Sequence, residues 1–445
     1  MQTPASSLNA LRRPILALLF LAISALHFAA AYVPGPARNW HGETSEYYPL
    51  LTDAFLAGRT SLLIAPDPRL LALPDPYDPV ANANYRLHDA SLYRGRYYLY
   101  FGPAPAIVLF LPYKLLTGSY LPTRAAVALF SIGGFGYSCL LFFRLARWEK
   151  WICPLWLESL AVLSFGASSF VLFLLTRPSF YETAISSAYC FLMGGFALLA
   201  YSLAAPAPRL SGLLFSGLCF GLAAGSRPTG CVLAALLAVL VAVRLRSYRL
   251  PVLTFVFPIA ICGVLLVWYN YARFQNPLEF GMRYSLLASA TDSSNHFSRG
   301  LRNLLPSLSR LLFARPWDDG NGPSAGLLWG APMALAGLLL PLLLLDRRVS
   351  ASIRSAAARF TILSVYASAA AILALLSVWG FTLGRYDVDF APEFVVAAWL
   401  LVAGLWQMAP RWEGTQRWLF RAAACGLTLY SVVLDFGACW QRLAR

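Results

Sequence analysis

The chain is poor in charged residues, and the few it has lie mostly outside its long apolar runs. Charged side chains make up 12% of the 445 residues, whereas 59% of the residues are hydrophobic. A water-soluble domain needs more polar surface than this to cover its apolar interior. The composition therefore excludes a soluble globular protein and predicts one that crosses a membrane many times.

Paired cysteines and clustered histidines are also missing. All eight cysteines lie within or at the ends of apolar runs, without the spacing of a disulfide framework or a zinc site, so we interpret them as small core hydrophobes. Of the four histidines, His88 has no second histidine at ligand spacing. No metal site is predicted, although a divalent metal near His88 and Asp89 stays open as an alternative.

The formal charge of +15 raises the question of nucleic acid. No arginine-rich face interleaved with exposed aromatic residues occurs outside the loops that flank apolar runs, so we expect no nucleic-acid partner. Basic residues instead mark cytoplasmic loops and meet membrane lipids. Arg12 and Arg13 place the N-terminus in the cytoplasm, and the strong basic bias with short loops indicates a bacterial inner membrane.

The apolar runs predict an all-α polytopic protein, because about 20 residues in a helix cross the roughly 30 Å of hydrocarbon. We expect about eleven spans in a single transmembrane domain over residues 1–445. They are Pro14–Val33, Leu121–Phe143, Cys153–Leu175, Thr183–Ala204, Ser211–Gly225, Thr229–Val243, Pro251–Tyr269, Ala325–Leu345, Phe360–Trp379, Phe394–Met408 and Trp418–Phe436.

Two long loops are expected outside the cytoplasm, at residues 34–121 and 270–324. In the first loop, charge alternation indicates that Ala104–Leu116, which contains prolines, is an interfacial or re-entrant helix rather than a span. Alternating aromatic residues predict a small hairpin around Arg94 and Gly95. In the second loop, residues 297–313 have leucines at helical spacing between arginines, which predicts a helix lying on the membrane.

Polar residues gather at the outer turns, whereas the spans are almost free of charge. That distribution argues against an ion-coupled transporter, which usually keeps carboxylates at the midplane. Arginine forks suit phosphate oxygens, and apolar helices suit a lipid tail, so a lipid phosphate is the expected ligand. Outside the cytoplasm such a ligand is typical of a polyprenyl-phosphate sugar donor. The candidates for binding its phosphate are Arg177, Arg227 and Arg385, with Tyr181.

Several motifs point to one family. After the first expected span, Glu43 is followed by Tyr47 four positions later and by Gly58 eleven beyond that. The proline-rich FGPAPAIVLFLPYKLLTG, the turn GSRPTG and the late RYDVDFAP follow. With these features the chain resembles the GT-C superfamily of integral-membrane, polyprenyl-phosphate-dependent glycosyltransferases. The resemblance implies a GT-C-like fold whose long first extracytoplasmic loop contains juxtamembrane helices.

The resemblance also implies roles for individual residues. The family's catalytic carboxylate falls on Glu43, with Glu46 as the rival base that takes a proton from the acceptor. Because Thr44 follows Glu43 where the family usually has an aspartate–glutamate pair, the choice of base and metal dependence stay open. Contacts to the acceptor or the sugar are expected from Tyr47, Asp89, His88 and Tyr97.

The sequence thus predicts a GT-C-type glycosyltransferase, a hexosyl- or pentosyltransferase, acting on an extracytoplasmic glycan, lipid or protein. Two alternatives from other classes share part of the evidence. A flippase or transporter of lipid-linked saccharides would carry basic groups deep in a central cavity rather than at one mouth. A non-catalytic membrane subunit of envelope assembly would keep the fold without a carboxylate facing the arginines.

Overall fold

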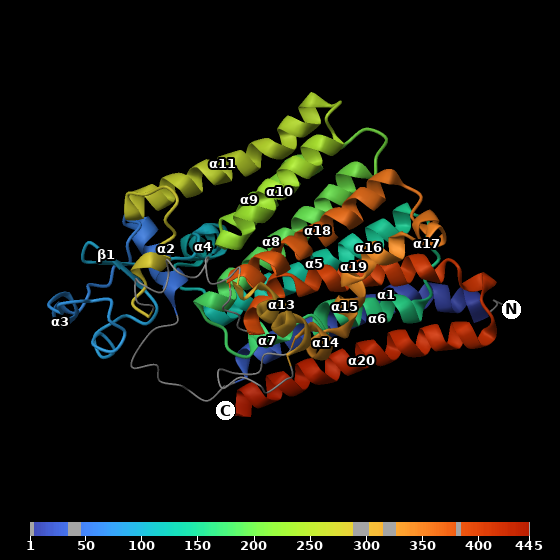
Figure 1. Cartoon of the computed structure of the whole chain (residues 1–445), viewed down its shortest axis with the longest axis horizontal. Coiled ribbons are helices and arrows are strands. Elements are labelled where there is room, and N and C mark those ends of the chain that lie inside the picture. Colours follow the sequence, from blue (N-terminus) through green and yellow to red (C-terminus); the bar gives the residue numbers. More distant parts are fainter. Residues whose placement is uncertain (1–3, 34–45, 288–301, 315–325, 380–383, 445) are drawn as a thin grey trace.

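The computed structural model describes residues 4–33, 46–287, 302–314, 326–379 and 384–444. Long helices lie side by side in one bundle, and a layer of short elements covers one end of it (Figure 1). We call this end, which carries α2, α3 and β1, the loop end. The N-terminus lies at the opposite end, and α20 brings the C-terminus back to the loop end (Figure 1).

Seven helical segments are long and apolar enough to cross a membrane, within the residues described. Six of them are single helices, and the shorter apolar helices α9, α10 and α19 lie among them. Their bounds are α1 (Pro4–Tyr32), α5 (Thr123–Trp148), α8 (Phe180–Leu203), α9 (Leu210–Ala224), α10 (Pro228–Arg244), α11 (Arg249–Phe274), α18 (Ala356–Trp379), α19 (Ala391–Trp406) and α20 (Gly414–Ala444). The predicted all-α membrane fold is confirmed.

Helix α8 is central and α1, α11 and α20 are peripheral. In the most apolar part of α8, 83% of the residues are buried, against 17% in α1 and α11 and 22% in α20. Helix α8 packs along α5 on one side and α9 on the other, and α9 packs along α11. The exposed residues of the peripheral helices are largely apolar, such as Leu18, Trp268 and Val433. These faces suit contact with lipid tails.

The predicted span Cys153–Leu175 is not one continuous helix. It consists of α6 (Leu155–Ala167) and α7 (Val171–Leu175). Phe170, between them, has a φ of +60°, in the left-handed region that a bulky side chain rarely adopts. Its N–H donates to Oδ2 of Asp435 on α20, 3.2 Å away, instead of to a carbonyl of the preceding turn. The distant carboxylate therefore stabilises the break.

The predicted span Ala325–Leu345 is also interrupted in its described part. It contains α14 (Leu327–Gly330), α15 (Pro332–Leu338) and α16 (Leu340–Leu344), and α17 (Arg347–Ser352) follows. Pro332 begins α15, and Pro341 is the second residue of α16. Proline lacks an N–H and disfavours helical geometry at the residue before it. Ala331, before Pro332, accordingly has a φ of −144° and a ψ of 68°, so Pro332 ends the preceding helix, whereas Leu340, before Pro341, is helical.

The layer at the loop end is built mainly from the first long loop. Its elements are α2 (Tyr47–Leu56), α3 (Pro68–Leu71), β1 (Ser91–Tyr93), β2 (Arg96–Tyr98), the π-helix η1 (Ala106–Phe110) and α4 (Leu111–Thr117). Strands β1 and β2 pair antiparallel, with Tyr93 opposite Arg96. Arg94 and Gly95 form their turn with φ values of +48° and +70°, as two-residue hairpin turns require. The predicted hairpin is confirmed.

This layer is attached to the bundle through backbone contacts. The N–H of Ala104 donates to the carbonyl of Gly225, 2.9 Å away, in the turn between α9 and α10. A Cβ at Gly102 would lie 2.0 Å from the same carbonyl oxygen, so only glycine permits this approach. Segment 106–117, which begins directly after this contact, is too short to cross the bilayer, in keeping with the interfacial helix predicted there.

The second long loop joins the same layer. Its first part contains the 3₁₀ turn η2 (Met282–Tyr284), and the N–H of Leu286 donates to the carbonyl of Ala90 at 3.1 Å. Further on, the predicted amphipathic helix is α13 (Leu304–Phe313), which buries Ser307 and Leu311 and packs on α18. Two more 3₁₀ turns, η3 (Gly384–Asp389) and η4 (Ala409–Arg411), flank α19.

Candidate functional site

Two arginines predicted to bind phosphate meet at the loop end. Arg227 directly precedes α10, and Arg385 lies in η3 before α19. Their guanidinium carbons lie 5.3 Å and 5.8 Å from the ring centre of Tyr386, respectively, so one ring contacts both cations. The hairpin of α9 and α10 and the connection between α18 and α19 therefore deliver two positive charges to the same place.

The guanidinium of Arg227 is buried with few partners. Its Nη2 lies 2.9 Å from Oδ2 of Asp389, and the ring of Phe101 lies 5.8 Å from its Cζ. The side chain is 7% exposed, yet Nε and Nη1 have no hydrogen-bond partner. A buried donor without an acceptor costs about 1–3 kcal/mol, so this arginine has an unused capacity to bind an anion.

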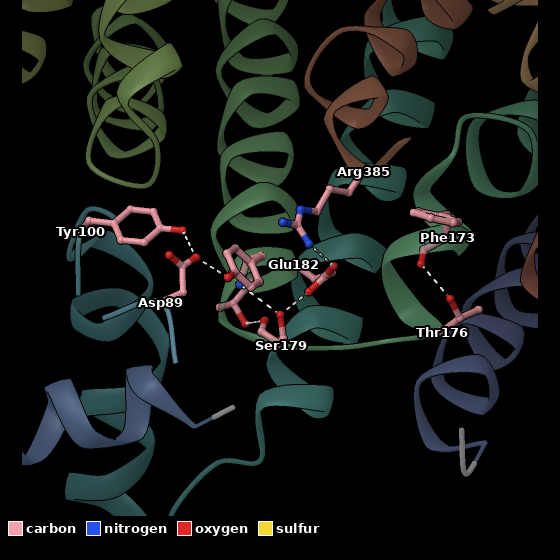
Figure 2. A network of polar contacts seen from close by, with 9 residues as sticks. Asp89, Tyr100, Phe173, Thr176, Ser179, Glu182 and Arg385 are labelled. Atoms are coloured by element: carbon pink, nitrogen blue, oxygen red, sulfur yellow. Dashed lines mark hydrogen bonds and ion pairs between the residues drawn. The ribbon is translucent and has the colours of Figure 1, made fainter. Parts of the chain in front are cut away.

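Arg385 lies between an aromatic ring and a carboxylate. Its Cζ is 4.1 Å from the ring centre of Tyr181, and its Nη1 is 3.8 Å from Oε1 of Glu182. Ser179, the N-cap of α8, donates its hydroxyl to the other oxygen of Glu182, as Figure 2 shows. Nε of Arg385 is buried without a hydrogen-bond partner. The start of α8 thus positions Arg385 and leaves one of its donors unused.

Asp89 connects the loop layer to this arginine. Its Oδ2 accepts hydrogen bonds from the hydroxyls of Tyr100, 2.7 Å away, and Tyr181 (Figure 2). Its Oδ1 accepts one from Ser285 of the second loop at 3.1 Å. The side chain is buried, and the backbone of Asp89 has a φ of +51°, which aspartate tolerates better than most residues. Because the Tyr181 ring contacts Arg385, Asp89 indirectly fixes where that guanidinium lies.

The structure describes only one of the two proposed bases. Glu43 lies outside the described residues. Oε2 of Glu46 accepts hydrogen bonds from the backbone N–H of Thr123 at 3.3 Å and from its hydroxyl at 2.7 Å. Thr123 begins α5, where a carboxylate is favoured by the free N–H groups and the helix dipole. Glu46 therefore has a structural role at the start of α5.

The remaining predicted site residues lie around the same layer. Tyr47 and Tyr97 are buried in its apolar core, at 1% and 2% exposure, and the Tyr47 hydroxyl donates to the carbonyl of His88. His88 is half-buried, and burial lowers the pKa of its imidazole. Arg177 is partly buried in the connection between α7 and α8, two residues before Ser179.

Two carboxylates of η3 were not assigned to the site from the sequence. Burial raises the pKa of Asp389 to about 6 although Arg227 pulls it down. Burial, then the nearby charges of Asp389 and Asp435, raise the pKa of Asp387 well above its usual range. The only signal in the sequence was the closeness of both residues to Arg385. Over the described ranges, no group of three histidine, cysteine, aspartate or glutamate side chains is arranged to hold a metal ion.

No protein-family model and no curated protein matches the chain. Solved structures do. ArnT from Cupriavidus metallidurans bound to undecaprenyl phosphate superposes with a TM-score of 0.50 at 13% identity, over 96% of this chain and 76% of ArnT. The oligosaccharyltransferase of Archaeoglobus fulgidus, tethered to an acceptor peptide, superposes with a TM-score of 0.52 at 14% identity, over 98% of this chain. This chain has the GT-C fold.

The GT-C fold extends over nearly the whole chain, since both superpositions include at least 96% of its residues. The chain covers 56% of the oligosaccharyltransferase, which is therefore much longer. Fold class and membrane character were both predicted from the residues and are confirmed.

Proposed function

We propose that this GT-C protein transfers a sugar from a polyprenyl-phosphate donor to an acceptor at the loop end of the bundle. The observation that carries the proposal is that the buried guanidinium of Arg227 and the partly buried guanidinium of Arg385 both lie close to the Tyr386 ring centre, at 5.3 Å and 5.8 Å respectively. Both keep buried N–H donors without an acceptor. Two such arginines favour an anion with several oxygens, and a phosphate has that shape.

The position of this pair favours a phosphate on a lipid. The arginines lie at the end of a bundle whose peripheral faces are apolar, and α8, α10 and α19, which begin beside them, are apolar helices. A polyprenyl chain can pack along such helices while its phosphate reaches their ends. The solved ArnT structure, which shares the fold, holds undecaprenyl phosphate.

The same arginines can assist the chemical step. When an acceptor oxygen attacks the anomeric carbon, the bond between that carbon and the phosphate oxygen breaks, and negative charge grows on the departing phosphate. Positioned guanidinium donors stabilise that charge more than the charge of the donor itself, which lowers the barrier. Arg177, close to Ser179 and Glu182 in the chain, is proposed as a third phosphate contact.

For the base we propose Glu43, which takes the proton from the acceptor hydroxyl. Glu43 lies four residues before α2 in the chain, and the other candidate, Glu46, already accepts hydrogen bonds at the start of α5. Of the proposed sugar or acceptor contacts, His88 is only half-buried and keeps that role. The other three, Tyr47, Tyr97 and Asp89, are buried. We propose that they support the site without contacting the sugar or the acceptor.

The loop end is proposed to face the outside of a bacterial inner membrane. Arg12 and Arg13, at the opposite end, belong on the cytoplasmic side by the positive-inside rule. Outside the cytoplasm nucleotide-activated sugars are scarce, which favours a lipid-linked donor. A flippase is disfavoured because Arg227 and Arg385 lie at one mouth of the bundle rather than along its axis.

Transfer by the purified protein in proteoliposomes tests the proposal. Radiolabelled hexosyl and pentosyl polyprenyl phosphates serve as donors, with a membrane extract as the source of acceptors. Wild type should release polyprenyl phosphate and label an acceptor, whereas Arg227→Gln and Glu43→Gln should lose at least tenfold in rate. Arg59→Gln, an exposed arginine of the same layer, is the matched control. Movement of the donor across the bilayer without release would favour a flippase and refute transfer.

A further inference from the structure

The contact between Arg227 and Asp389 is an ion pair without a directed hydrogen bond. Nη2 of Arg227 lies 2.9 Å from Oδ2 of Asp389, and the two side chains are 7% and 5% exposed. Oδ2 nevertheless accepts no hydrogen bond, and Nε and Nη1 of the arginine donate none. Removing two charges from water is repaid only when geometry is good and the remaining donors and acceptors are satisfied. This pair meets neither condition, so it is open to competition.

A phosphate is a better partner for this guanidinium than Asp389 is. Two phosphate oxygens can accept two parallel N–H bonds from one arginine fork, so the donors that Asp389 leaves unused would be engaged. An arginine that turns to such a ligand gives up at least part of its contact with Asp389. What then happens to the carboxylate depends on the other charges around it.

Among the described residues, nearly all of those other charges are carboxyl groups. Helix α8 contributes Glu182, which contacts Arg385; α19 contributes Glu393; and η3 itself contributes Asp387, which also interacts with Asp435 of α20. Helix α7, which also packs against η3, has only apolar residues. Of the residues that the structure describes, Arg227 is the one whose positive charge lowers the pKa of Asp389. Without it, a buried carboxylate among other carboxyls takes up a proton.

We propose that Asp389 is a displaceable counter-ion of Arg227, which exchanges its contact with the guanidinium for a proton when a lipid phosphate binds. The inference rests on the proposed function in one respect, namely that a phosphate binds Arg227. The balance is simple: the phosphodiester brings one negative charge, Asp389 loses one by accepting a proton from water, and the net charge of the buried site is unchanged. Release of the lipid returns the proton.

The exchange makes phosphate binding depend on pH in one direction. Burial already raises the pKa of Asp389 to about 6 while Arg227 is its partner, and loss of that partner raises it further. Below about pH 6 the carboxyl is protonated before the ligand arrives, so affinity does not depend on pH. Above about pH 6, the affinity for the phosphodiester falls by up to tenfold per pH unit, until the pH exceeds the pKa that Asp389 has in the lipid-bound protein.

Calorimetry on the full-length protein in lipid nanodiscs measures the exchange directly. The probe is undecaprenyl methyl phosphate, a diester without the second ionisation that a phosphate monoester has near pH 6. Titrations at pH 7 in buffers of different ionisation enthalpy give the number of protons taken up. Wild type should take up close to one proton, and its affinity should fall about tenfold from pH 6.5 to 7.5.

Two variants separate Asp389 from its neighbours. Asp389→Asn should bind the diester with no proton uptake, and its affinity at pH 7.5 should match that of wild type at low pH. Asp387→Asn changes a nearby buried carboxyl whose pKa is raised well above its usual range and that is not the partner of Arg227 in the ion pair, so uptake should stay at the wild-type value. Wild type that binds without taking up protons overturns the proposal, whether or not the variants fold. Equal uptake by Asp389→Asn also overturns it, whereas wild type that does not bind the diester contradicts the proposed function instead.

Discussion

Replacing Asp89 with asparagine tests how the loop layer is joined to the bundle. The Asp89 carboxylate accepts hydroxyl hydrogen bonds from Tyr100, Tyr181 and Ser285, which come from three different parts of the chain. Hydrogen bonds to a charged acceptor contribute about 1.5–3 kcal/mol each, and neutral ones about 1 kcal/mol. Asparagine keeps the shape and tolerates the φ of +51°, but it removes the charge and replaces one of the two acceptor oxygens with an NH₂ donor. We expect a loss of about 1.5–6 kcal/mol in the free energy of unfolding, from a difference of about 0.5–2 kcal/mol for each of the three bonds.

Thermal unfolding in detergent, followed by intrinsic fluorescence, measures this effect. Asp89→Asn should lower the Tm by several degrees, and Asp89→Ala by more, because alanine leaves buried phenols without an acceptor and strains the left-handed backbone. Asp75→Asn is the control: it changes an exposed aspartate of the same loop that caps the N–H of Tyr77, and asparagine caps equally well. If Asp89→Asn has the same Tm as wild type, the Asp89 contacts do not hold the layer in place.

Two further changes test the packing and the electrostatics of the loop end. Gly102→Ala places a Cβ 2.0 Å from the carbonyl oxygen of Gly225 and should cost about 1–3 kcal/mol or more in thermal melts, whereas Gly263→Ala, with open space around it, should not. Asp387→Asn should raise the Tm at neutral pH. The folded-state pKa of Asp387 is raised, so its contribution to stability is present at low pH and is lost as the pH rises; the gain from asparagine should therefore grow from about pH 4 upward. A gain that shrinks with rising pH would contradict this.

Hydropathy and charge predicted most of the fold, because crossing a bilayer imposes strong local requirements on the sequence. The hairpin turn at Arg94 and Gly95 was likewise predictable from adjacent residues. The break at Phe170 was not, since its N–H is satisfied by Asp435, far away in the chain. The expected continuous span therefore failed where a distant side chain replaced a helical carbonyl.

For the candidate site, sequence reasoning found residues but not their partners. Arg227 and Arg385 were both singled out as outer arginines, and the fold brings them to the same tyrosine ring. The partners of Asp89 and the pairing of Asp389 with Arg227 arise only when α8, α10 and η3 pack together. No local periodicity or spacing encodes such contacts.

The most direct test of the central claim compares lipid binding with and without the phosphate. Undecaprenyl phosphate and undecaprenol share the same chain, so their difference in affinity for the protein in nanodiscs reports what the phosphate contributes. Wild type should bind the phosphate at least tenfold more tightly than the alcohol, and that preference should disappear in the double variant Arg227→Gln, Arg385→Gln. Equal affinities in wild type, or a preference that survives in the double variant, would contradict a phosphate site at these arginines.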